Sequence, residues 1–434
     1  MLRFSNNPFC KKPFLLGEST LSFVITMNKR NLILKALEEN DGIVRLAPTW
    51  VPRSFLSPGK RLKLAAEDIY ALGAERGGID ERWLASTTRA DNPGAPEDEG
   101  LSYIVVGSGA KTSKVLLKDA IDEFGESFLG KDVMRKYGGW MVLAKFFDNS
   151  CMIPLHLHQM EKHARKVNRL PKPEGYYFPP QLNIVEGDFP YTFFGLEPGT
   201  TREDIKKCLE RWDMGDNGIL YFSRAYKLKP GTGWFVPAGV LHAPGTLVTY
   251  EVQKSSDVAA IYQSMLDDKP ISWDLLVKDV PKEHHRDLDY IVDMIDWKEN
   301  LDPEFKKHHY IEPIPAEDLE ETREVGYEEK WVVYGSEEFS AKELTVYPKA
   351  HVKIFDRAAY GLIAIQGHGR IGKFRVEAPT IIRYGDLTND EFFVTVEAAK
   401  EGVEIINESA NENLVMLKHF GPGNPDAPKS IGRN

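Results

Sequence analysis

The segment Met152-Ile-Pro-Leu-His156-Leu-His158-Gln-Met-Glu-Lys-His-Ala164 carries two histidines separated by a single leucine. Side chains alternate between the two faces of a β-strand, so His156 and His158 would point to the same side of a strand. In that arrangement both imidazoles could bind one ion. Such a pair is often an ordinary surface feature when it stands alone, so a metal site requires further ligands elsewhere in the chain.

A later segment supplies a third histidine. The residues Gly231-Thr-Gly-Trp-Phe-Val-Pro-Ala-Gly-Val-Leu-His242 fit the pattern G-x5-P-x-G-x2-H, which is the second motif of the cupin β-barrels. In that motif proline and glycine turn the chain between two strands, and the histidine points into the barrel. A carboxylate, Glu174, lies between the two histidine segments in a Lys-Pro-Glu turn.

Three imidazoles and one carboxylate form a donor set that suits a divalent transition metal. Zinc, iron, manganese, cobalt and nickel all accept these ligands, so the donor set does not choose among them. We therefore predict one divalent metal ion as a cofactor. Its predicted ligands are His156, His158, Glu174 and His242.

With these segments in place, the sequence resembles the type I mannose-6-phosphate isomerases, which are zinc-dependent double cupins. The resemblance runs from about Trp50 to about Asp257 and continues more faintly to the C-terminus. It implies a mainly β fold, a double jelly roll (bicupin) with a small helical insertion. The flanking segments that agree with the family are Phe128-Leu-Gly-Lys131, Lys145 eleven residues before His156, Glu81-Arg-Trp83 and Gly215-Asp-Asn-Gly218.

The resemblance also implies which residues form the site. In the family a Gln-x-His pair, a glutamate in a Lys-Pro-Glu-Met segment and a histidine in a Pro-His-Ala segment bind the metal. These positions match the four predicted ligands, so the resemblance favours zinc. Glu251, nine residues after His242, matches a glutamate that the family places beside its substrate.

Three positions depart from the family pattern. Pro154-Leu155-His156 replaces Ser-Ile-Gln, which removes a hydroxyl near the phosphate and exchanges an amide ligand for an imidazole. Ile261 stands where the family has an arginine that binds phosphate, and arginine is the preferred bidentate partner of phosphate. Pro244 replaces an aromatic residue, which should reshape the mouth of the pocket. We therefore do not expect mannose 6-phosphate itself to be the substrate.

Charged residues inside apolar strands mark further site candidates. Lys145 interrupts the apolar run from Trp140 to Phe147, and a buried lysine needs a partner. Glu251 alternates with apolar residues between positions 248 and 252, so it lies on a polar face, either inside a barrel or at a solvent-facing edge. We predict Glu251 as the catalytic base, Lys145 or Lys172 as the group that stabilises or protonates oxygen, and Glu81 as an orienting residue.

The predicted organisation has four parts. Residues 1–26 are expected to be a disordered N-terminal extension, and residues 27–266 a metal-binding cupin domain with the helical insertion. Residues 267–335 are expected to be a connector, and residues 336–434 a second, degenerate jelly roll without metal. Predicted helices span 31–39, 118–128 and 200–212. Predicted strands span 103–106, 140–147, 218–229, 246–254, 352–355, 361–366, 369–374, 380–384, 392–396 and 414–417.

Composition sets the class of protein and its partners. The chain has 434 residues, of which 42% are apolar, and this is long enough for two or three domains with sizeable cores. A net charge of −10 argues against nucleic acid or an anionic membrane surface as the main partner. Cys10, Cys151 and Cys208 show no paired spacing, which favours a reducing compartment and predicts a cytoplasmic location. A homodimer is possible.

Together these features predict an isomerase that interconverts an aldose and a ketose, acting on a sugar or sugar derivative through an enediol. Two alternatives remain open. A three-histidine, one-glutamate set can also serve a cupin oxygenase or lyase with iron or manganese. A cupin that binds sugar without catalysis could keep the same ligands.

Overall fold

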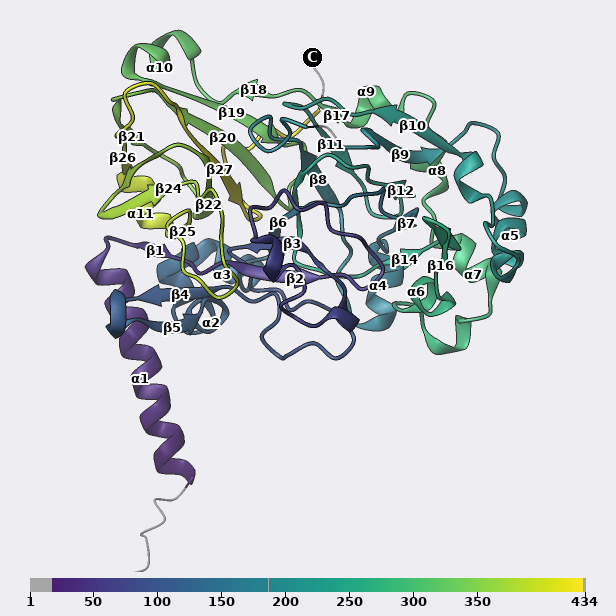
Figure 1. The fold of residues 1–434 in the computed structure, drawn as a ribbon, viewed down its shortest axis with the longest axis horizontal. Coiled ribbons are helices and arrows are strands. Elements are labelled where there is room, and N and C mark those ends of the chain that lie inside the picture. Colours follow the sequence, from purple (N-terminus) through teal and green to yellow (C-terminus); the bar gives the residue numbers. More distant parts are fainter. Residues whose placement is uncertain (1–17, 186, 432–434) are drawn as a thin grey trace, which may run out of the picture.

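The computed structural model describes residues 18–185 and 187–431 of the chain. It is mainly β, as predicted, and its two large sheets stand back to back with a smaller sheet outside each of them (Figure 1). The strand pairs within every sheet are antiparallel. Outside the sheets, Leu64 and Ile382 form one isolated parallel bridge.

The first half pairs a seven-stranded sheet with a five-stranded sheet. The larger sheet has the order β17 (Tyr310–Ile311), β11 (Gly233–Val236), β8 (Glu174–Tyr177), β13 (Thr249–Lys254), β6 (Val142–Phe147), β3 (Ile79–Leu84) and β2 (Thr49–Pro52). The smaller sheet has the order β10 (Ser223–Lys227), β9 (Tyr191–Leu196), β12 (His242–Ala243), β7 (His156–Leu157) and β14 (Ala260–Ile261).

The second half repeats this arrangement with a seven-stranded and a four-stranded sheet. The larger sheet has the order β1 (Ile43–Arg45), β25 (Glu391–Val394), β22 (Tyr360–Gln366), β27 (Leu414–Phe420), β20 (Ser340–Val346), β19 (Tyr327–Val333) and β18 (Ile314–Pro315). The smaller sheet has the order β21 (His351–Ile354), β26 (Val403–Asn407), β23 (His368–Ile371) and β24 (Phe374–Glu377). Two hairpins complete the strands, β4 (Tyr103–Val106) with β5 (Ser113–Leu116) and β15 (Met265–Leu266) with β16 (Lys269–Pro270).

Apolar side chains fill the space between the layers. One cluster joins the two large sheets and includes Phe146 and Tyr250 from the first half with Ile363 and Leu417 from the second. Burial of such side chains contributes roughly 1.5–3 kcal/mol each, so this interface holds the two halves together. This packing covers one face of the first large sheet. The other face, which we call its inner face, is left for the site.

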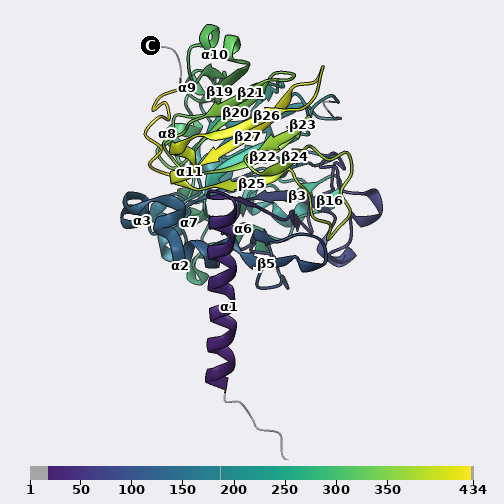
Figure 2. The same cartoon turned by 90° about the vertical axis from the view of Figure 1, so that its left-hand side faces the viewer.

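Helices connect and cover these sheets. The long helix α1 projects away from the rest of the molecule in both views (Figures 1 and 2). No helix among the described residues is long and apolar enough to cross a membrane. The helices are α1 (Glu18–Glu39), α2 (Leu117–Leu129), α3 (Lys131–Tyr137), α4 (Glu161–Ala164), α5 (Arg202–Glu210), α6 (Trp273–Val277), α7 (Leu288–Asp293), α8 (Trp297–Asn300), α9 (Phe305–His309), α10 (Leu319–Val325) and α11 (Val396–Glu401).

Most element predictions are confirmed, with α5 as the clearest case. Thr201 caps this helix by accepting from the backbone N–H of Asp204, whose side chain bonds back to the backbone of Thr201. The predicted strand over 380–384 is wrong, because only Ile382 forms a β-bridge there, with Leu64, and a turn begins at Tyr384.

The division of the chain into units remains a prediction. Of the expected disordered extension, residues 1–17 lie outside the described residues and residues 18–26 belong to α1. The expected connector is richer in structure than predicted, since it contains helices α6 to α10 and strands β16 to β19. Of these strands, β19 pairs along its length with β20 and so belongs to the second large sheet.

Candidate metal centre and its cavity

Three histidines meet in the first half of the molecule. On β7 and β12, which are adjacent strands, His156 and His242 are direct cross-strand partners, so their side chains share one face of the sheet. His158 follows immediately after β7. The ring centroids of His156 and His242 lie 4.1 Å apart, and those of His158 and His242 lie 5.1 Å apart. All three are buried, and ligand atoms of the three lie within 4.8 Å of one another.

Backbone carbonyls fix the orientation of each ring. The Nδ1 atoms of His156, His158 and His242 lie 2.7, 2.7 and 2.9 Å from the carbonyl oxygens of Pro154, Val258 and Val240. A carbonyl oxygen only accepts hydrogen bonds, so Nδ1 carries a proton in each ring, and Nε2 is the atom that remains to bind a metal. Burial is the first cause that lowers the pKa of His156 and His158, the latter to about 4, so both rings are neutral at pH 7.

Glu174 completes the donor set at the start of β8. Its Oε2 atom lies 3.0 Å from Nε2 of His158, and its Oε1 atom lies 3.0 Å from Nε2 of His242. At His158 the ammonium group of Lys172 lies 2.9 Å from Nε2 and also pairs with Glu174, so a cation already bridges these two groups. Nε2 of His242 is buried without a hydrogen-bond partner. The set of three imidazoles and one carboxylate therefore fits a divalent metal ion, which would satisfy this nitrogen.

A second set of charged side chains lies beside these ligands on the inner face of the large sheet. Glu251 on β13 is the cross-strand partner of Lys145 on β6, so their side chains share a face. The Nζ atom of Lys145 lies 2.9 Å from Glu81 and 3.6 Å from Glu251. The Nζ atom of Lys172 lies 3.2 Å from Glu251 and 2.9 Å from Glu174.

Two effects compete at Glu251. Burial, followed by the negative charge of Glu174, raises the pKa of the Glu251 carboxyl to about 7, although Lys145 and Lys172 oppose this shift. Glu81 behaves in the opposite way. Burial alone would raise its pKa, but Arg53 and Lys145 more than offset that effect and lower the pKa of Glu81 to about 2. Of these two carboxyl groups, Glu81 stays ionised over the physiological range of pH and Glu251 titrates near neutral pH.

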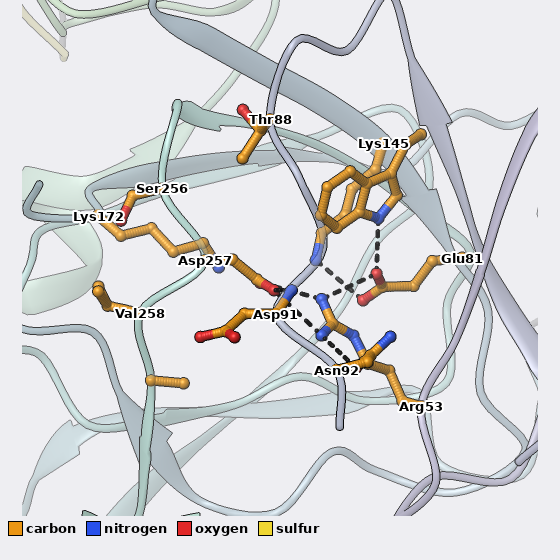
Figure 3. Close-up of polar contacts among 12 residues, drawn as sticks. Arg53, Glu81, Thr88, Asp91, Asn92, Lys145, Lys172, Ser256, Asp257 and Val258 are labelled. Carbon is orange, nitrogen blue, oxygen red and sulfur yellow. Dashed lines mark hydrogen bonds and ion pairs between the residues drawn. The ribbon is translucent and has the colours of Figure 1, made fainter. Parts of the chain in front are cut away.

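Arg53, which follows β2, belongs to the site but was not predicted from the sequence. Its guanidinium binds Asp257 through two hydrogen bonds of 3.0 and 3.2 Å and lies 3.2 Å from Glu81 (Figure 3). It also donates to Asn92 at 3.0 Å. Residues 53 and 257 are distant in sequence and follow no motif. The one available signal was a charged residue directly after an apolar strand, at Trp50-Val-Pro-Arg53.

Opposite charges alternate along this wall of the cavity. Each carboxylate lies within 3.6 Å of a neighbouring cation, and all of the groups are buried or nearly so. Three cations thus alternate with four carboxylates, so each buried charge has an opposite charge beside it. In order, the groups are Asp257, Arg53, Glu81, Lys145, Glu251, Lys172 and Glu174.

A cavity of about 660 Å³ opens onto these groups. Six of the eight residues predicted from the sequence line it, namely Glu81, Lys145, His156, His158, Lys172 and Glu251. Glu174 and His242 contact each other and lie deeper. The structure thus brings all eight together, while their roles remain predictions. Ile261, the cross-strand partner of His156, also lines the cavity, as does Pro244.

The second half carries a different buried cluster. Lys418 lies 2.6 Å from Asp356 and also pairs with Glu329, and Lys342 lies within 2.8 Å of both carboxylates. Two lysines thus balance two carboxylates inside this half, so the cluster calls for no further cation. Within residues 18–185 and 187–431, the one metal-type group of three or more histidine, cysteine or acidic residues is the histidine cluster of the first half.

Replacing Arg53 should destabilise the fold. Arg53→Met leaves the buried carboxylates of Asp257 and Glu81 without this partner, so we expect a loss of about 3–5 kcal/mol in the free energy of unfolding. Denaturant unfolding measures the change. The exposed Arg135→Met is the control and should stay within about 0.5 kcal/mol of the wild type. A loss below about 1 kcal/mol for Arg53→Met would show that the guanidinium is not needed to balance these charges.

Comparison with known proteins identifies the fold. No protein-family model and no curated protein matches the chain by sequence. Solved structures do match. A mannose 6-phosphate isomerase from Bacillus subtilis is 16% identical and aligns over 87% of this chain and 99% of its own, with a TM-score of 0.55. A putative mannosephosphate isomerase from Archaeoglobus fulgidus is 13% identical over 88% of this chain and 97% of its own, with a TM-score of 0.55.

A zinc-bound mannose 6-phosphate isomerase is 14% identical and aligns over 88% of this chain and 100% of its own, with a TM-score of 0.56. At such identities the likeness establishes the fold. The predicted bicupin architecture is therefore confirmed, and the chain has the fold of these isomerases over most of its length.

Proposed function

We propose that this protein is a divalent-metal-dependent isomerase that interconverts an aldose and a ketose, acting on a sugar or sugar derivative. One observation carries the proposal. The Nε2 atoms of three buried histidines and the carboxylate of Glu174 converge beside a cavity whose wall presents Glu251 between two lysines. The shared fold with mannose 6-phosphate isomerases supports it.

His156, His158, Glu174 and His242 would hold the metal, with zinc as the first expectation and iron, manganese, cobalt or nickel as alternatives. A bound divalent ion would supply Lewis acidity toward the carbonyl and hydroxyl oxygens of the substrate. The remaining chemistry belongs to the side chains of the chain itself.

Glu251 is placed to act as the base. In the direction from aldose to ketose, its carboxylate takes the proton from C2 of the substrate, and an enediolate forms. The same carboxyl then returns the proton to C1, while the proton of the C2 hydroxyl passes to the oxygen on C1, so that C2 becomes the carbonyl carbon. Lys145 and Lys172 donate hydrogen bonds to the oxygens where negative charge develops. Glu81 acts on Lys145 through the 2.9 Å contact, which holds the ammonium group toward Glu251.

The cavity does not favour mannose 6-phosphate as the substrate. Ile261 offers no hydrogen bond. Each cation that lines the cavity pairs with a carboxylate, and these cations are Arg53, Lys145, Arg169, Lys172 and Lys278. A dianionic phosphate would compete with those carboxylates, whereas an oxygen of an uncharged sugar can accept a hydrogen bond from a lysine that keeps its carboxylate partner.

The rate should depend on the ionisation of Glu251. Only the carboxylate form can accept the proton, and burial raises the pKa of this group to about 7. We therefore expect kcat/KM of the metal-loaded protein to fall as the pH falls below about 7, with the midpoint moved lower by the charge of the bound ion. A pH series between 5 and 9 measures this, and a rate that rises toward pH 5 would contradict the assignment.

The direct test of function is hydrogen exchange at C2. The protein is loaded with zinc and incubated in deuterium oxide with free aldoses, and mass spectrometry follows the uptake of solvent deuterium. The proposal expects exchange that disappears when the metal is removed. Oxygen consumption without exchange would favour the oxygenase alternative, and binding without either reaction would favour a sugar-binding protein.

Location and assembly remain predictions. We expect a cytoplasmic protein and a possible homodimer, which cell fractionation and light scattering test. Neither nucleic acid nor a membrane is an expected partner, because the charge of the chain is strongly negative.

A further inference from the structure

The cavity has a second wall that the proposed reaction does not use. Besides the charged groups, apolar side chains line it, and six of them belong to one hydrophobic cluster. They come from the segment after β2, from the segment before β7, from β14 and from α6. They are Phe55, Leu56, Ile153, Ile261, Leu275 and Val277.

Strand register places this apolar wall close to the metal ligands. Ile261 and His156 are direct cross-strand partners, so Ile261 projects beside an imidazole on the same face of the sheet. Phe55, Ile153 and Leu275 are only partly buried, so part of each apolar surface remains open to a ligand. The cavity therefore has a largely charged wall and a largely apolar one, and Asp274, Lys278 and Asp279 add charge near α6 on the second.

An unmodified sugar fits such a cavity poorly. It carries a hydroxyl on nearly every carbon, and a hydroxyl pressed against isoleucine, leucine or valine loses its hydrogen bonds to water without replacement. An alkyl or aromatic group in the same place gains free energy from leaving water. A volume of about 660 Å³ also falls in the range of cavities that hold drug-sized ligands.

We infer that the substrate joins an α-hydroxycarbonyl head, which faces the charged wall, to an apolar group that lies against Phe55, Ile261, Leu275 and Val277. Deoxysugars and sugars that carry an acyl, alkyl or aryl substituent belong to this class. The inference rests on the proposed function, because the isomerase chemistry defines which end of the substrate is the head.

The test uses hexoses that differ only at C6. The zinc-loaded full-length protein is titrated with mannose and glucose, each carrying at C6 a hydroxyl, a hydrogen, a phosphate or a benzoyl ester, and calorimetry measures each affinity. We expect the benzoyl ester to bind about tenfold or more tighter than the parent sugar. The 6-deoxy sugar should fall between these two, and the phosphate should bind weakest.

Two valines provide matched variants. Val277 and Val280 are both buried in the same cluster, but only Val277 lines the cavity. Val277→Thr keeps the shape and adds a hydroxyl, so it should weaken binding of the benzoyl ester about fivefold and leave the parent sugar within about twofold. Val280→Thr should change neither affinity. Equal effects of the two variants would overturn the inference.

Ile261→Arg is the converse variant. It should shift the preference from the benzoyl ester toward the phosphate, because a guanidinium binds phosphate and leaves less room for an apolar group. If the wild type exchanges hydrogen at C2 of the parent sugars but binds all four C6 forms alike, the inference fails and the proposed function stands. If none of the probes binds or exchanges, the proposed function fails and the inference fails with it.

Discussion

His242→Ala should abolish binding of the divalent metal ion. The wild type purified without chelator is expected to carry about one equivalent, and the variant less than a tenth of that. The Nε2 atom of His242 is buried, lacks a hydrogen-bond partner and lies 3.0 Å from Glu174, so its lone pair has no other evident role. Loss of a direct ligand should weaken binding by at least the roughly 100-fold that loss of a supporting partner can cost.

His163→Ala is the control for this experiment. His163 is also buried, but it lies outside the histidine cluster and contacts Asp293. This variant should keep its metal. Elemental analysis of both proteins, together with their circular dichroism spectra, separates loss of a ligand from loss of the fold. Full metal occupancy in folded His242→Ala protein would mean that this residue is not a ligand.

Glu251→Gln should abolish most of the isomerase activity while the metal stays bound. The amide keeps the size of the side chain but cannot accept the proton from C2. Positioned general bases typically contribute 100- to 10,000-fold, so we expect kcat to fall about 1,000-fold. Metal content should stay at the wild-type level, because Glu251 contacts the ligand Glu174 only through Lys172.

The matched control is Glu343→Gln in the second half. Glu343 is a part-buried strand glutamate that accepts a hydrogen bond of 2.8 Å from Tyr177, and burial raises its pKa as well. Its activity should stay within about twofold of the wild type. Solvent deuterium uptake at C2 provides the rate for each protein. A Glu251→Gln variant with near-normal exchange would assign the base to another group.

Local periodicity predicted much of the site correctly. Alternation along a strand placed His156 and His158 on one side and put Glu251 on a polar face, and the structure shows both arrangements. Strand β7 itself contains only His156 and Leu157, so neighbouring strands rather than strand length hold the histidines in place.

Contacts between distant segments could not be predicted in this way. Arg53 and Asp257 follow β2 and β13, which β3 and β6 separate in one sheet, and no spacing in the sequence records that these two side chains meet. The short helices α6, α8 and α9 contain four or five residues each, which is too few for a helical period to show. The apolar wall could likewise not be predicted from the sequence, since its six residues come from four separate segments.

X-ray absorption spectroscopy of the metal in the purified wild-type protein tests the central claim most directly. The account predicts about one equivalent of a divalent ion. Its ligands should be nitrogen and oxygen at about 2.0–2.2 Å, with outer-shell scattering from about three imidazole rings. A protein that takes up no ion, or an ion bound through sulfur at about 2.3 Å, would contradict the convergence of His156, His158, Glu174 and His242 on one metal.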